Sequence, residues 1–184
     1  MKIDRIAESH TTSLRGASAG LLLAVLTLLF GQGMGIVFGL NEDAIKSRLK
    51  MSAAEVRDTT YKGDDAAIKA VLDKSWAYMQ RAHLHAGGLG TTALGLIILL
   101  CLLGTSRRVT VALGVALGAG GFGYSFYWMW AGFRAPGLGS TGAAKESLKW
   151  LAMPSSGAFV LATVAVLVLL IVTCVRRKSG IASN

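Results

Sequence analysis

Four long segments without a charged residue constrain the fold of this chain more than any other feature. They run from Gly16 to Leu40, Ala82 to Ser106, Val109 to Phe133 and Trp150 to Val175. A helix rises about 1.5 Å per residue and the hydrocarbon layer is about 30 Å thick, so about 20 apolar residues span it. Membrane β-barrels instead show short alternating strands. The segments predict an all-α integral membrane protein, a four-transmembrane-helix bundle.

The composition agrees with this class. Only 16% of the 184 residues are charged, whereas soluble domains carry about 25%. We expect one membrane domain over residues 1–184. The first hydrophobic run is expected to stay in the protein, because it lacks the small-residue cleavage site of a secretory signal. The predicted spans are 17–40, 82–104, 109–133 and 154–175.

The net charge of +9 is distributed as a topology signal, not as a nucleic-acid surface. With four spans, its three basic groups fall on one side of the membrane, and the positive-inside rule makes that side cytoplasmic. Both termini are therefore expected in the cytoplasm, a pattern that suits a bacterial inner membrane. The groups are Lys2, Arg5 and Arg15; Arg107 and Arg108; and Arg176, Arg177 and Lys178.

The segment 41–81 has eight basic and seven acidic residues, so it is nearly neutral and is predicted to be extracytoplasmic. We expect it to be helical. The sequence SAAE at Ser52–Glu55 matches a capping box, which predicts a helix start there. The sequence GDD at Gly63–Asp65 predicts another break and start.

Apolar residues after Asp65 recur at spacings of three and four, which is one face of an α-helix. This pattern predicts a helix that runs straight into the second span and projects from the membrane. Something else must then cover its apolar stripe on the outside. The stripe is Ile68, Leu72, Trp76, Met79 and His83.

Two histidines, His83 and His85, open the second apolar segment. Residues two apart on a helix point about 200° from each other, so the pair cannot grip one metal ion. His83 lies above Gly87 and Gly90, a groove against which a haem bound through the imidazole would fit. The other interpretation is a polar headgroup-level residue beside glycines that pack two helices. His85 faces away and is expected at the interface or at a partner contact.

Other residues at the same depth extend the haem hypothesis. Met34 is a candidate second axial ligand to the iron that His83 would bind, although a methionine here also suits packing. Tyr124, Tyr127 and Arg134 are candidates for binding a quinone head or haem propionates. An aromatic belt at the membrane surface is the alternative for the tyrosines.

Glycines also recur every four residues in the first and third segments. Such rows let helix backbones approach closely in a bilayer. They predict a tight bundle, with or without a ligand between its helices. The rows are Gly31, Gly35 and Gly39, and Gly114 and Gly118.

The stretch RAHLHAGGLGTTALGLIILL resembles the histidine-bearing helix of small relatives of haem–copper oxidase subunits. That resemblance implies a haem-iron ligand at His83 or His85. It does not imply oxygen reduction, because that family spreads its ligand histidines over several helices. It implies a b-type haem or an accessory subunit.

These observations predict a membrane subunit of a respiratory or electron-transfer assembly that binds haem b or a quinone near the outer face. Its expected partners are the lipid bilayer and other membrane subunits or copies of itself. A scaffold without cofactor is the first alternative. A channel or carrier for a neutral solute is the second, with few polar residues in the spans to support it. No span holds a charge, and no hydrolase or transferase motif occurs.

Overall fold

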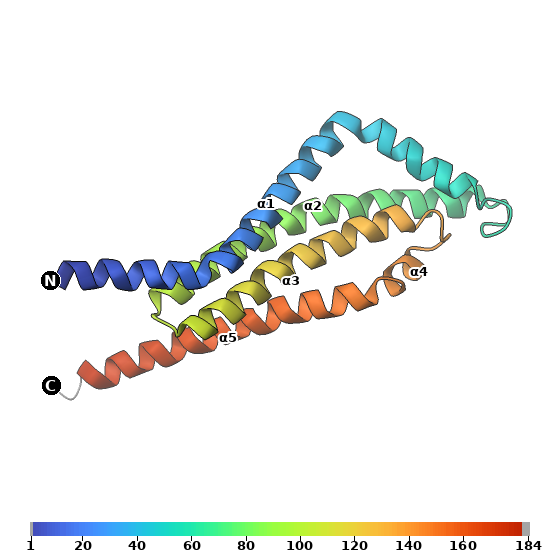
Figure 1. The fold of residues 1–184 in the computed structure, drawn as a ribbon. Coiled ribbons are helices and arrows are strands. Elements are labelled where there is room, and N and C mark those ends of the chain that lie inside the picture. Colours follow the sequence, from blue (N-terminus) through green and yellow to red (C-terminus); the bar gives the residue numbers. More distant parts are fainter. Residues whose placement is uncertain (1, 182–184) are drawn as a thin grey trace.

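The computed structural model describes residues 2–181, and side chains within residues 16–176. Every regular element in that range is a helix. In chain order the helices are α1 (Lys2–Ala54), α2 (Asp65–Leu102), α3 (Arg107–Arg134), α4 (Thr141–Glu146) and α5 (Lys149–Ile181) (Figure 1).

Four of these helices, α1, α2, α3 and α5, are long and apolar enough to cross a membrane. Large aliphatic side chains on their surfaces, such as Leu22, Ile36 and Leu161, are more than half exposed. Contiguous apolar surface is unfavourable in water, whereas acyl chains solvate it. The all-helical prediction is confirmed, and the four candidate membrane-spanning helices indicate an integral membrane protein.

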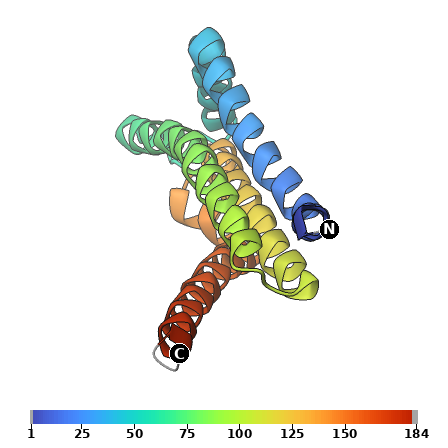
Figure 2. The same cartoon turned by 90° about the vertical axis from the view of Figure 1, so that its left-hand side faces the viewer.

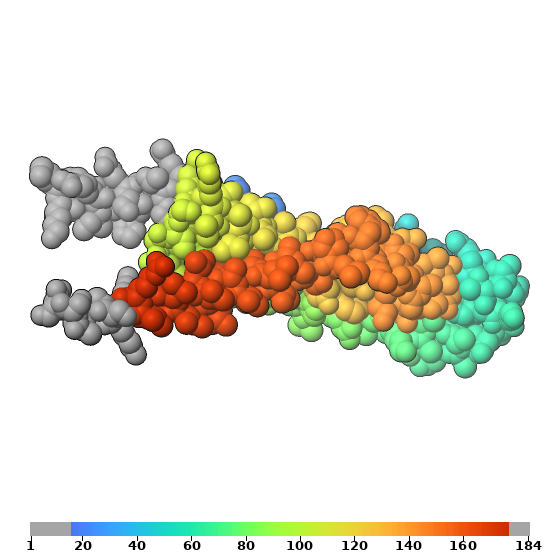
Figure 3. Space-filling view, turned by 90° about the horizontal axis from the view of Figure 1, so that it is seen from below, coloured from blue at the N-terminus to red at the C-terminus, as the bar shows by residue number. Residues whose placement is uncertain are grey.

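Three helices pack mutually and the fourth lies to one side. α1, α2 and α3 contact one another, while α5 packs chiefly against α3. Figure 2 shows α1 and α5 on opposite sides of the α2–α3 pair, and Figure 3 shows α5 running along one face. We call the end where α1 starts and α5 finishes the proximal end. The other, with the α1–α2 loop and α4, is the distal end (Figure 1).

Each half of the molecule has its own apolar core. The proximal core joins all four long helices, and the distal core joins them around aromatic side chains. The proximal core includes Ala24, Ile97, Leu117, Phe159 and Val166. The distal core includes Met34, Tyr78, Ala86, Trp128 and Leu148.

Glycines bring the helix backbones together, as the spacing of the rows indicates. A β-carbon at Gly20 would lie 2.6 Å from the carbonyl carbon of Gly114, where α1 crosses α3. A β-carbon at Gly118 would lie 2.6 Å from Cβ of Leu23. Gly39, the last member of the α1 row, has no atom within 4 Å of such a position and is not a packing residue.

The helices extend beyond the predicted spans at the distal end. α1 kinks at Asn41 (φ −130°, ψ 22°) and continues to Ala54. The predicted helix start at Ser52 is therefore wrong, because Ser52 lies in the last turn of α1. The helix continues this far because Leu49 and Ala53 are buried on its inner face.

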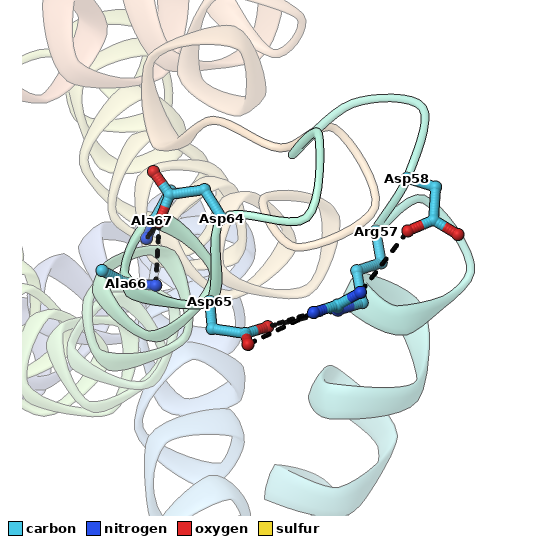
Figure 4. Close-up of polar contacts among 6 residues, drawn as sticks. All are labelled: Arg57, Asp58, Asp64, Asp65, Ala66 and Ala67. Atoms are coloured by element: carbon cyan, nitrogen blue, oxygen red, sulfur yellow. Dashed lines mark hydrogen bonds and ion pairs between the residues drawn. The ribbon is translucent and has the colours of Figure 1, made fainter.

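The predicted start at GDD is confirmed. The Asp64 carboxylate accepts hydrogen bonds from the amides of Ala66 and Ala67, each 2.9 Å long (Figure 4). From Asp65 the chain forms one helix into the second apolar segment, as predicted. The fourth long helix begins at Lys149, so Pro154 lies inside it and not in its first turn.

The two distal loops are joined by a buried tyrosine. The Tyr61 hydroxyl donates a 2.8 Å hydrogen bond to the carbonyl oxygen of Pro136, and its side chain is 6% exposed. Gly139 has a positive φ of 65°, and a β-carbon there would overlap the γ-methyl group of Thr60. We call these contacts, between residues 55–64 and 135–140, the distal cap.

Replacing Tyr61 with phenylalanine is expected to destabilise the protein by about 1 kcal/mol at neutral pH, the net value of one hydrogen bond. Burial raises the pKa of the Tyr61 phenol above its ordinary value. Because the folded state favours the protonated phenol, this group contributes its full stability to the fold below the unfolded-state pKa of about 10. The contribution is lost as pH rises through the higher folded-state pKa. The stability difference between wild type and variant should therefore narrow above about pH 10. Thermal unfolding measured from pH 7 to 11 checks this, and a constant difference would contradict it.

Candidate functional site

His83 points from α2 into the interface with α1. Its Nδ1 lies 2.8 Å from the carbonyl oxygen of Gly31. A β-carbon at Gly35 would lie 2.8 Å from its Cε1, so the ring occupies a notch that only glycine leaves. Because a carbonyl oxygen only accepts, Nδ1 carries the proton and Nε2 carries the lone pair in the neutral ring. The sequence predicts that the His83 imidazole faces inward, and in the structure it does.

The glycines below His83 do not border a slot between α1 and α2. A β-carbon at Gly31 would lie 3.1 Å from the backbone nitrogen of Gly87, and one at Gly90 would lie 2.9 Å from Cγ of Leu28. A β-carbon at Gly87 itself would project into open space. The two helices therefore touch along this row, and a flat macrocycle does not fit between them here.

Met34 lies in the distal core, where it is 6% exposed. Its cluster includes Ala82 and Ala86 of α2 and Ala131 of α3. The side chain therefore fills the junction of three helices.

Three other predicted residues, His85, Tyr124 and Tyr127, are brought together on the opposite side of α2. The His85 ring lies 5.3 Å from Tyr124 and 6.1 Å from Trp128, centroid to centroid. Tyr124 stacks on Tyr127 at 5.8 Å. We call this group the distal aromatic cluster; it comprises Tyr78, Arg81, His85, Tyr124, Tyr127 and Trp128.

Arg81 supplies the positive charge of the distal aromatic cluster. Its guanidinium lies 4.5 Å from the ring centroid of Trp128 and 5.5 Å from that of Tyr78. Such cation–π contacts fix the position of the cation without neutralising it. Arg134, the predicted cation, lies at the last position of α3, and the cationic contacts of the cluster come from Arg81.

The cluster contains one buried hydrogen-bond donor without a partner in the described part of the chain. The indole Nε1 of Trp128 is buried and, among the described residues, has no hydrogen-bond partner. Trp128 is only 9% exposed. Buried donors are nearly always paired, so an unpaired one calls for an acceptor from outside these side chains. The phenols of Tyr78, Tyr124 and Tyr127 add further hydroxyl groups, and His85 and Tyr124 are the half-exposed members.

Arg81, Tyr78 and Trp128 were missed from the sequence. Their signal is the spacing of four shared by two facing helices: Arg81 and His85 on α2, Tyr124 and Trp128 on α3. Residues four apart share a helix face, so each pair presents one surface to the other. Finding the site required knowing that these two faces meet.

A multi-ligand metal centre has no basis in the described part of the chain. No group of three histidine, cysteine, aspartate or glutamate side chains comes together there. Iron held by His83 would take its four equatorial ligands from haem.

No protein-family model, curated protein or solved structure matches this chain.

Proposed function

We propose that this protein is a membrane subunit of an electron-transfer assembly and binds the head of a quinone at the distal aromatic cluster. The observation that carries the proposal is the unpaired, buried N–H of Trp128 within a group of planar rings. A quinone head is a flat ring with two carbonyl acceptors. Its flat ring matches the stacking surface, and its carbonyl oxygens match the unpaired indole N–H of Trp128 and the guanidinium of Arg81.

Each member of the cluster has a role in this proposal. The indole of Trp128 donates to one carbonyl oxygen, and the Tyr127 hydroxyl or the Arg81 guanidinium donates to the other. The half-exposed rings of His85 and Tyr124 stack on the head. The half-exposed rings of His85 and Tyr124 form the side of the cluster from which the apolar tail of the quinone would extend into lipid.

The orientation in the membrane is part of the proposal. The basic groups lie at the proximal end of the helices and predict that this end is cytoplasmic. The distal aromatic cluster then lies near the outer face of a bacterial inner membrane. Further membrane subunits would supply the electron donor and acceptor.

A haem b bound through His83 is the second candidate. The hydrogen bond from Nδ1 to Gly31 supports it, because metal-binding histidines commonly donate their second ring N–H and present the other nitrogen to the metal. Because the helices touch at Gly31 and Gly90, such a haem would have to lie outside the α1–α2 interface. A scaffold without cofactor remains the simplest alternative to both.

Titration with a short-chain ubiquinone tests the main proposal. Trp128→Phe keeps a ring and removes the N–H, and its affinity should fall about tenfold, the value of one well-formed hydrogen bond. Trp130→Phe is the matched control: Trp130 lies two residues away, is 45% exposed and should bind like wild type. Isothermal titration in nanodiscs measures all three.

The outcomes separate the candidates. No binding to wild type, or equal losses in both variants, would overturn the quinone proposal. A Soret band in the absorption spectrum of the purified protein, lost in His83→Ala, would favour haem. If protein made in quinone- and haem-replete cells shows neither quinone binding nor a Soret band, the scaffold without cofactor is the remaining candidate.

A further inference from the structure

A second candidate site lies at the distal end, separate from the aromatic cluster. After its kink at Asn41, α1 folds back towards the start of α2, and the two helices enclose an angle (Figure 1). A groove of about 820 Å³ lies between residues 46–54 of α1 and residues 65–76 of α2. Ligand pockets are typically about 300–1,000 Å³, so this groove has the size of a small-molecule site. We call it the distal groove.

The distal groove has an apolar floor. Leu49 of α1 is buried, and Ile68, Leu72 and Trp76 of α2 are half-buried. The last three belong to the apolar stripe that the sequence predicted to be covered on the outside. α1 covers only part of the stripe. An apolar body of a ligand would bury the remainder.

A pair of side chains lies at each end of the groove. At the membrane-facing end, Trp76 packs against Phe38 with ring centroids 5.4 Å apart. At the far end, Arg57 holds Asp65 through two nitrogens, with Nε and Nη2 at 3.1 and 3.0 Å from Oδ1 (Figure 4). These two pairs mark the limits of the groove along the helices.

The rim carries an excess of positive charge. Four cations and two carboxylates line it, and three of the cations are paired: Arg57 with Asp65, Lys69 with Asp73, and Lys46 with Glu42 just outside the groove. Among the described residues, Lys50 is the lining cation without a carboxylate partner. The site thus combines an apolar floor with one uncompensated ammonium group.

We propose that the distal groove binds a single-chain lipid with a negatively charged head, of which a long-chain fatty acid is the simplest member. The chain lies on Leu49, Ile68 and Leu72, and the head pairs with Lys50. Lys46 lies on the same wall, with its Nζ 5.1 Å from the Trp76 ring centroid and its charge paired with Glu42. This proposal does not depend on quinone binding, since the two sites share no residue.

Photolabelling in nanodiscs of neutral lipid tests the proposal. The probe is a long-chain fatty acid with a diazirine at its chain end, and labelled positions are mapped by peptide mass spectrometry. Labelling is expected within residues 46–76 in addition to the exposed apolar faces of the spans. Oleate should compete for the groove label, whereas oleyl alcohol and acetate should not.

Two charge-reversal variants, which change the net charge equally, test where the negatively charged head of the lipid binds. Lys50→Glu should reduce groove labelling about fivefold, because reversal of one exposed charge changes the binding energy by about 1 kcal/mol. Arg48→Glu is the control, since Arg48 is exposed on the same helix and does not line the groove. Equal effects of the two variants, competition by oleyl alcohol, or absence of groove labelling for any reason would overturn the proposal.

Discussion

Gly20→Ala is expected to destabilise the protein by about 3 kcal/mol, the upper range for overpacking a tight contact. The added methyl group would lie 2.6 Å from the carbonyl carbon and 2.7 Å from the Cα of Gly114. These are backbone atoms, so no side-chain rotation relieves the overlap. α1 must move away from α3, and the proximal core loses contacts. Thermal unfolding in detergent measures the effect.

The reciprocal substitution and a distant glycine serve as controls. A β-carbon at Gly114 would lie 3.6 Å from Cα of Gly20, an ordinary contact, so Gly114→Ala should cost little. Gly95 faces open space, and Gly95→Ala should be neutral or stabilising, because alanine favours a helix over glycine by up to about 1 kcal/mol. Similar losses in all three variants would show that helix backbones do not meet closely at Gly20.

The contact between Gly20 and Gly114 shows what the sequence predicts and what it misses: Gly114 belongs to a predicted glycine row, whereas Gly20 belongs to none. Long uncharged segments identify membrane-spanning helices because the bilayer demands length and apolarity from each one separately. Glycine rows likewise indicate close packing. They do not identify the partner: Gly114 meets α1, whereas Gly120, in the same helix, meets Ser155 and Phe159 of α5.

The distal end was harder to predict, because a local capping pattern does not show whether a helix begins or ends there. SAAE satisfies a capping box, yet at Ser52 the chain is leaving a helix and not entering one. α1 continues to Ala54 because Leu49 and Ala53 are buried against other parts of the fold, a tertiary effect that the local sequence does not show. GDD was easier, since the Asp64 side chain caps its own helix through bonds two and three residues away.

The candidate site likewise has features that follow from local sequence and features that depend on tertiary packing. Periodicity places His83 on the inner face of α2. Whether the glycines beneath it leave a slot depends on Leu28, which belongs to another helix and fills the space at Gly90. Similarly, the sequence alone identifies Trp128 only as one member of an aromatic run. Its contacts with Arg81 and His85 depend on how α2 packs against α3.

Gly139→Ala is expected to open the distal cap and cost about 3 kcal/mol. Two effects combine. A left-handed conformation costs a non-glycine residue about 1–2 kcal/mol, and φ at Gly139 is 65°. The new methyl group also overlaps the γ-methyl of Thr60, which stands beside the Tyr61–Pro136 hydrogen bond. Thermal unfolding measures the total, and faster proteolysis of residues 55–64 reports opening of the cap.

Two further variants separate these effects. Gly104 also has φ 65°, but nothing lies within 4 Å of its β-carbon position, so Gly104→Ala should show the conformational cost alone. Removing the γ-methyl with Thr60→Ala should rescue Gly139→Ala to the level of Gly104→Ala, because the remaining Cβ of Thr60 lies 3.4 Å from the added carbon. The double mutant would then be more stable than Gly139→Ala, a non-additivity that only residues in contact produce. If the two substitutions add, Thr60 does not touch residue 139 and the cap is not packed as described.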